Sequence, residues 1–311
     1  TWMVIGIVIM IEIIINLLSH KKNNLKWLLY IFFGLFLSFI GSLKLYLPII
    51  SYLPMSTRSI GKQGGSGIEY ATDYSFSFSE LMTFIIPSFS GFGDQTYWGT
   101  MPFTSFPQYM SLVVLIFALY GVLRGDGGRI KLYSIICLIF FLLLSMGKNL
   151  IGFYSFFYNY LPLFSKFRNP AYLLIIVQFF VMILGGLGLS KIFFDLKQSN
   201  KTAFGFLLII VSLTFFSSLV DFSKYGEKAY LYDKNNIIEE YKNNLIKSNP
   251  DLLSNSVPFN YDDFINEQLK RIDLIYQDKI ILHEQMIKTD IILIHILVVS
   301  TILLTLISCY T

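Results

Sequence analysis

The sequence predicts an all-α, polytopic helical membrane protein with about seven transmembrane helices, interfacial helices and a small extracytoplasmic helical insert. Two observations predict this class. Hydrophobic residues make up 54% and charged residues only 14% of the 311 residues, with a mean hydropathy of +0.61, whereas a soluble domain of this size needs a more polar surface. Several apolar runs are also long enough, at about 18 residues, to cross a bilayer as helices.

These apolar runs recur along the chain and are separated by polar connections. Membrane-spanning helices are expected at 2–18, 27–47, 109–123, 132–146, 172–189, 202–220 and 290–308. The sequence therefore divides into a membrane region at 1–220, an insert at 221–288 and a last, truncated span within 289–311. Because the chain begins and ends inside an apolar run, we expect it to be a fragment of a longer protein.

Composition excludes several function classes. The net charge is only +4 and no block of basic residues is present, so nucleic acid is not an expected partner. The two cysteines, Cys137 and Cys309, fall inside apolar runs, which argues against a disulfide framework. No metal-ligand spacing and no nucleophile motif is found, so neither a metal nor a cofactor is expected. The run Gly185-Gly186-x-Gly188 is typical of close helix packing.

The positive charges of the connections predict an orientation. The loops 19–26, 124–131 and 190–201 carry nine Lys and Arg residues, whereas 48–107 and 147–171 carry five. Loops rich in Lys and Arg stay in the cytoplasm, so the first three loops are expected there. The other two, together with the insert, are then expected outside the cytoplasm.

The connection from Ser145 to Tyr172 interleaves cations with aromatic rings and contains no acidic residue. Its cations are Lys148, Lys166 and Arg168. Aromatic rings favour the headgroup level of a bilayer, and cations at that level bind phosphates. We therefore expect this stretch to help bind an anionic, lipid-like substrate. The alternative is that its cations only snorkel or bind ordinary lipid headgroups.

The segment 48–107 contributes further candidate residues. Ser77-x-x-Glu80 has the form of a capping box, which predicts a short apolar helix ending at Pro87 and lying in the interface. Arg58, Glu80 and Asp94, combined with the cations described above, would form a pocket with charges of both signs. Cations there would hold a phosphate, and a carboxylate could act as general base on an acceptor hydroxyl. The alternatives are a cap for Glu80 and a turn for Asp94.

The insert predicts two helices. The first is expected at 235–247, and the second begins near Asp262 and continues toward the last span. The second helix carries a stripe with spacings of 4, 3, 4, 4 and 3 that favours a core between the two helices over a binding groove. This stripe consists of Ile265, Leu269, Ile272, Tyr276, Ile280 and His283. Asp290, at the start of the last span, is expected to cap a helix N-terminus, because the N-terminal end of a helix favours an anion.

Three motifs, SELMTFIIPSFSGFGDQTYWGTMPF, SMGKN and YNYLPLFSKFRNP, resemble the YfhO family of bacterial membrane proteins. The resemblance is strongest over 53–219 and implies a GT-C-type glycosyltransferase in the bacterial inner or plasma membrane. Such an enzyme uses a polyprenyl-phosphate-linked sugar at the outer face, among membrane lipids. Its catalytic acid is expected in a first outer loop, which would precede Thr1. The matching positions are Glu80, Tyr97, Trp98, Lys148, Lys166, Arg168 and Asn169.

Two other functions stay open at this point. A transporter or flippase for lipid or polysaccharide would need polar residues along a path at the bilayer midplane, and the expected spans carry almost no charge at their centres. A non-catalytic membrane scaffold would use the insert as a docking module.

Overall fold

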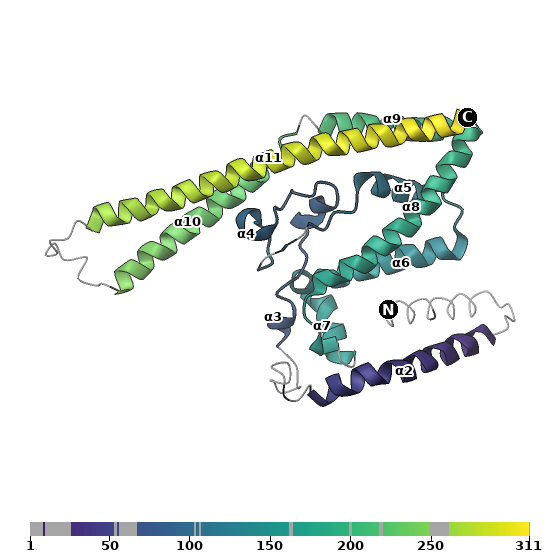
Figure 1. Ribbon diagram of the computed structural model, residues 1–311, viewed down its shortest axis with the longest axis horizontal. Helices are drawn as coiled ribbons and strands as arrows, with labels where there is room; N and C mark the ends of the chain where they lie inside the picture. Colours follow the sequence, from purple (N-terminus) through teal and green to yellow (C-terminus); the bar gives the residue numbers. More distant parts are fainter. Residues whose placement is uncertain are drawn as a thin grey trace. The chain divides into compact units, whose positions relative to one another are not determined.

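The computed structural model describes residues 9, 26–52, 55, 67–102, 104–105, 107–161, 164–198, 201–217, 220–248 and 261–310. Every regular element in these ranges is an α-helix or a 3-10 helix, which confirms the all-α class (Figure 1). The expected span at 2–18, apart from residue 9, and Arg58 lie outside the described residues.

Three helical stretches in the described part of the chain are long and apolar enough to cross a membrane. They are Gly128–Ser145, which is α6; Pro170–Lys197, which joins the 3-10 helix η6 (Pro170–Leu173) to α8 (Leu174–Lys197); and Asn266–Ile307, within α11 (Tyr261–Tyr310). Three further helices coincide with other expected spans, namely α2 (Lys26–Tyr52), α5 (Leu112–Arg124) and α9 (Lys201–Ser217). The total of about seven spans stays a prediction.

The chain forms two compact units. The first unit comprises residues 1–76 and 118–188, and the second comprises 77–117 and 189–311. Of the three boundaries between them, one lies between residues 76 and 77 and the other two fall within α5 and α8.

In the first unit, α5 and α8 approach closely because glycines line the contact. A Cβ built on Gly121 would lie 2.1 Å from the carbonyl oxygen of Leu184 and 2.9 Å from the amide nitrogen of Gly188. Only a residue without a side chain permits such a distance between helix backbones. The close-packing interpretation of the Gly185-Gly186-x-Gly188 run agrees with this contact.

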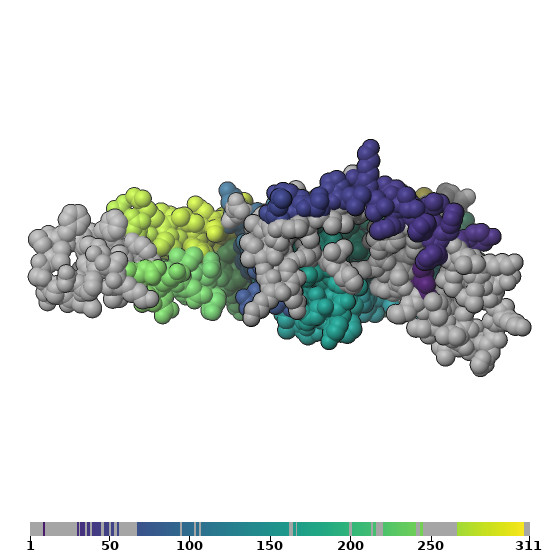
Figure 2. All heavy atoms as spheres, turned by 90° about the horizontal axis from the view of Figure 1, so that it is seen from below, coloured from purple at the N-terminus to yellow at the C-terminus, as the bar shows by residue number. Residues whose placement is uncertain are grey.

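The second unit is built around a long helical pair, α10 (Ser223–Ser248) and α11. The two helices lie side by side, as the green and yellow segments in Figures 1 and 2 show. Lys234 Nζ lies 2.7 Å from Asp273 Oδ1, and Tyr276 donates a hydrogen bond to Asp233. The two helices expected in the insert are therefore present, although the first begins at Ser223, twelve residues before the predicted start.

Two members of the predicted stripe of α11 are buried, and the side chain of another member, Ile265, lies outside the described atoms. Tyr276 and His283 are buried, and a Cβ on Gly226 of α10 would lie 2.2 Å from the ring of His283. The helix then continues without a break through Asp290. The expectation that Asp290 caps a helix N-terminus was therefore wrong. Its carboxylate instead accepts a hydrogen bond of 2.7 Å from the amide of Ser88.

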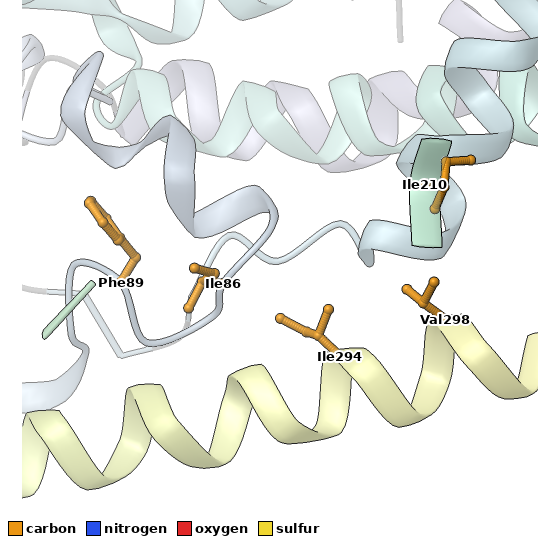
Figure 3. Close-up of a cluster of buried hydrophobic side chains, with 5 residues drawn as sticks. All are labelled: Ile86, Phe89, Ile210, Ile294 and Val298. Carbon is orange, nitrogen blue, oxygen red and sulfur yellow. The ribbon is translucent and has the colours of Figure 1, made fainter. Parts of the chain in front are cut away.

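Apolar side chains from three parts of the second unit form a buried core. Figure 3 shows Ile294 and Val298 pointing from α11 toward Ile86 and Ile210. Ile86 belongs to the turn that follows the 3-10 helix η3 (Ser79–Phe84), and Ile210 belongs to α9. This core anchors the irregular segment around residue 86 to the last helix. The short helix expected before Pro87 is thus a 3-10 helix of six residues.

Candidate substrate-binding residues

The candidate site in the first unit is built on a short segment after Gly67. The helix α3 (Ile68–Ala71) ends in a turn at which Thr72 Oγ1 donates to the carbonyl of Ile68 at 2.8 Å. Ser75 Oγ then donates to the carbonyl of Thr72 at 2.5 Å. Side-chain hydroxyls bonded to nearby carbonyls favour turns over helix continuation. The chain consequently leaves the helix and runs on as the irregular segment 72–76.

This segment is attached to the end of α6 and to the next 3-10 helix, η4 (Gly147–Leu150). The amide of Phe76 donates to the carbonyl of Ser145 at 3.0 Å. The amide of Lys148 donates to Ser75 Oγ at 2.8 Å, and Asn149 Nδ2 donates to the carbonyl of Phe76 at 2.9 Å. The backbone groups of this irregular segment therefore find their hydrogen-bond partners in residues about 70 positions away in the sequence.

Gly147 makes this attachment possible. Its φ is +41°, a conformation that residues with a Cβ rarely adopt. A Cβ at this position would lie 2.0 Å from Ser75 Oγ and 2.9 Å from Pro170 Cγ. A glycine at 147 thus allows two segments, one at Ser75 and one at Pro170, to meet the end of α6.

Arg168 is the best-defined cation of the stretch from Ser145 to Tyr172. Its Nη2 lies 3.1 Å from Asp73 Oδ2, and its Nη1 donates to the hydroxyl of Tyr70 at 3.0 Å. The guanidinium carbon also lies 3.9 Å from the centre of the Tyr70 ring and 5.0 Å from that of Tyr74. The side chains of Arg168 and Asp73 remain 28% and 39% exposed, so the guanidinium is held in place and still reachable from outside.

The next residue, Asn169, adopts a left-handed conformation with φ 71° and ψ 74°. Such a backbone is uncommon for residues other than glycine, although Asn tolerates it best. Within the described part of the chain, the buried atoms Asn169 Oδ1 and Arg168 Nε have no hydrogen-bond partner. Buried polar atoms usually have one, so this dipeptide keeps a donor and an acceptor unused.

The first unit also contains a cluster of mostly aromatic side chains. Its buried members are Leu144, Tyr154 and Phe164, and the helix α7 (Ile151–Tyr160) supplies several of its rings. Burial raises the pKa of the Tyr154 hydroxyl to about 12. Four large side chains of the same stretch are instead mostly exposed: Phe156, Tyr160, Phe167 and Tyr172.

The other two cations of this stretch lie in short 3-10 helices. Lys148 lies in η4 with an exposed side chain, and its backbone amide serves the Ser75 contact. Lys166 ends the 3-10 helix η5 (Phe164–Lys166), and its side chain lies outside the described atoms.

The second unit contains Glu80 and Tyr97, which the structure brings into contact. Glu80 is 2% exposed, and its Oε2 accepts hydrogen bonds from the amide of Ser77 at 2.9 Å and from the hydroxyl of Ser77 at 2.7 Å. Its Oε1 accepts from the hydroxyl of Tyr97 at 2.6 Å. Burial and the neighbouring carboxylate raise the pKa of Tyr97 well above its usual range. Both carboxylate oxygens are occupied, so Glu80 braces the loop. Its bond to the amide of Ser77 is one half of the predicted capping box, whereas the N-cap of η3 is Phe78, which makes no side-chain capping bond.

Trp98 and Asp94 belong to the same segment. Trp98 Nε1 donates to the carbonyl of Phe89 at 3.0 Å, and the two rings pack with their centres 5.7 Å apart. Asp94 lies in the short helix α4 (Gly93–Thr96), and its side chain is outside the described atoms. Trp98 is therefore part of the packing around Phe89.

Sequence reasoning missed the acidic partner of Arg168. The stretch from Ser145 to Tyr172 contains no acid, but Asp73, 95 positions earlier, supplies one. No spacing rule connects residues so far apart, and a single Tyr-x-x-Asp sequence is too common to serve as a signal.

Comparisons with known proteins leave the family open. No protein-family model, curated protein or solved structure matches this chain.

Proposed function

We propose that this chain is part of a membrane glycosyltransferase that moves a sugar from a polyprenyl-phosphate donor to an extracytoplasmic glycan or polymer. In this proposal Arg168 binds the donor phosphate. The observation that carries it is the position of the guanidinium, which is fixed by Tyr70 and Asp73 and yet remains partly exposed. The resemblance of the surrounding motifs to the YfhO family points to the same chemistry.

The contacts of Arg168 suit a phosphate better than they suit a purely structural ion pair. A guanidinium can bind an oxyanion through two parallel N–H groups. Asp73 uses one N–H at Nη2 and Tyr70 uses one at Nη1, so each of these nitrogens keeps a second N–H. A phosphate presents several acceptor oxygens and can use donors that Asp73 leaves unused.

Such a cation would also assist the chemical step. In sugar transfer the bond between the anomeric carbon and the phosphate oxygen breaks, and negative charge grows on the departing phosphate. A guanidinium fixed before the reaction stabilises that charge without reorganisation. The exposed rings of Phe156, Tyr160 and Phe167 offer an apolar surface on which a prenyl chain can lie.

The test compares Arg168→Gln with Asp73→Asn in binding to a polyprenyl phosphate in nanodiscs. Both variants remove the same partly exposed ion pair, so each should lower stability by less than about 1 kcal/mol. Arg168→Gln should weaken binding roughly 10-fold to 100-fold, because a charge-assisted hydrogen bond contributes about 1.5–3 kcal/mol. Asp73→Asn should leave binding unchanged or tighter, because it removes a competing carboxylate.

Two control ligands identify what is bound. A polyprenol without phosphate should bind weakly to both the wild type and the variants, and phosphatidic acid tests for general affinity toward anionic lipids. The proposal fails if Asp73→Asn loses as much affinity as Arg168→Gln, because Arg168 then serves only to hold the segment around Asp73. It also fails if phosphatidic acid binds as tightly as the polyprenyl phosphate.

A further inference from the structure

A second site of a different kind lies on α11 in the second unit. A shallow pocket of about 300 Å³ is formed between the loop that begins at Ser88 and one face of α11, just before the apolar run that starts at Ile291. Its polar lining residues are Ser88, Gln285, Thr289 and Asp290, and apolar walls come from Phe92 and Met286, among others. None of these residues takes part in the binding proposed for Arg168.

The loop side of this pocket is held rigidly. The Nε2 atom of the buried His283 lies 3.0 Å from the carbonyl oxygen of Ser88 and 3.1 Å from that of Phe89. Tyr230, whose ring packs edge-on against that of His283, donates a hydrogen bond to the carbonyl of Thr96. The loop is therefore attached to both α10 and α11. A ligand that binds there would lose little free energy to ordering the loop.

Asp290 has a remaining acceptor atom in this pocket. Its Oδ2 accepts the amide of Ser88 at 2.7 Å, and within the described residues Oδ1 takes no hydrogen bond. Thr289 Oγ1 donates to the carbonyl of Gln285 at 2.8 Å, which leaves the lone pairs of its oxygen available. The segment 285–290 of α11 thus presents a carboxylate oxygen, a hydroxyl oxygen and the amide of Gln285, which is an exposed residue.

The charge of the lining narrows the class of ligand. Asp290 is the one charged residue of the lining, so a phosphate or another anion would be repelled. A divalent metal prefers several carboxylate or His ligands, and the described part of the chain contains no group of three such residues. A hydrocarbon chain would leave these polar groups without partners, at a cost in free energy.

We propose that this pocket binds a neutral pyranose sugar. Sugar hydroxyls donate to carboxylate and hydroxyl oxygens and exchange two hydrogen bonds with an amide. The C–H face of the ring packs on an apolar wall such as Phe92. The volume lies at the lower end of ligand sites, which suits a single sugar unit. The inference concerns α11 and the loop at Ser88, and it does not depend on Arg168.

The experiment uses the purified protein in a zwitterionic detergent without sugar headgroups. Three methyl glycosides, those of glucose, galactose and N-acetylglucosamine, are titrated and followed by saturation-transfer NMR. At least one should bind saturably, with a dissociation constant on the order of 1 mM. Gln285→Ala and Asp290→Asn should each weaken it roughly 10-fold, and an Asn at 290 can still accept from the amide of Ser88.

Gln277→Ala is the matched control, because Gln277 is an exposed glutamine two turns earlier on α11 and outside the pocket. Its affinity should equal that of the wild type. The inference is overturned if none of the three glycosides binds saturably, or if Gln277→Ala weakens binding as much as Gln285→Ala. It is also overturned if ethanolamine, a small organic cation, binds more tightly than every glycoside.

Discussion

Replacing Gly147 by Ala tests the joint at the end of α6. The backbone conformation, with φ +41°, costs a residue with a Cβ about 1 kcal/mol. The new Cβ would lie 2.0 Å from Ser75 Oγ, so Ser75 must move away. That movement breaks its hydrogen bond with the amide of Lys148, which costs about 1 kcal/mol more. Crowding against Pro170 adds roughly another 1 kcal/mol.

The expected loss of about 3 kcal/mol should lower the midpoint of thermal unfolding by roughly 6 °C. The buried thiol of Cys137 provides the assay, because a thiol-reactive dye labels it only when α6 opens. A Cys309→Ser background leaves Cys137 as the single cysteine. Gly152→Ala is the matched control, since Gly152 is exposed in α7 and its Cβ would meet nothing within 4 Å.

In this control the midpoint should stay or rise, because Ala is the better helix former by about 0.5–1 kcal/mol. A Ser75→Ala background removes the clashing oxygen, so Gly147→Ala should cost less there. Equal midpoints for Gly147→Ala and Gly152→Ala would refute the reasoning.

Three further predictions concern the second unit and are checked by the midpoint of thermal unfolding, followed by far-ultraviolet circular dichroism. Glu80→Gln should lower the midpoint by an amount equivalent to about 1–3 kcal/mol, because an amide cannot accept all three hydrogen bonds that reach the buried carboxylate. The control Glu69→Gln, at an exposed residue, should leave the midpoint unchanged. Gly226→Ala should lower stability by about 1–3 kcal/mol, because its Cβ would meet the His283 ring, which contacts two loop carbonyls. The control Gly205→Ala, with open space around its Cβ, should leave stability unchanged. The raised pKa of Tyr97 means that the unfolded chain loses this proton near the ordinary value of 10.0, while the folded protein retains it. The stability that the protonated hydroxyl confers is therefore complete below pH 10 and is lost as the pH rises above it. The unfolding midpoint of the wild type should therefore fall relative to that of Tyr97→Phe between pH 9 and 11. Parallel curves of midpoint against pH for the two proteins would contradict this assignment.

Local patterns predicted the helices of this protein well. The spacing of Leu269, Ile272, Tyr276 and Ile280 correctly indicated a helix of the insert that packs on a second one. Apolar length identified α6 and α8. These signals succeed because the features they describe repeat within a few turns of one helix.

The candidate sites depend on contacts that no local pattern contains. Asp73 reaches Arg168 across 95 positions, and Ser88 reaches Asp290 across 202. The carboxylate of Asp290 looked like a cap because a polar run ends there, yet helical propensity and the contact with Ser88 carry the helix through it. His283 was placed on the correct face, but its bonds to two loop carbonyls required the tertiary structure.

The continuity of α11 has a mechanical consequence. Its 50 residues contain neither proline nor glycine, the usual sources of a sharp kink, and they extend about 75 Å at a rise of 1.5 Å per residue. A hydrocarbon layer is only about 30 Å thick. The helix is therefore about 45 Å longer than such a layer is thick, and a displacement at Tyr261 is transmitted toward Val298 along one continuous helix.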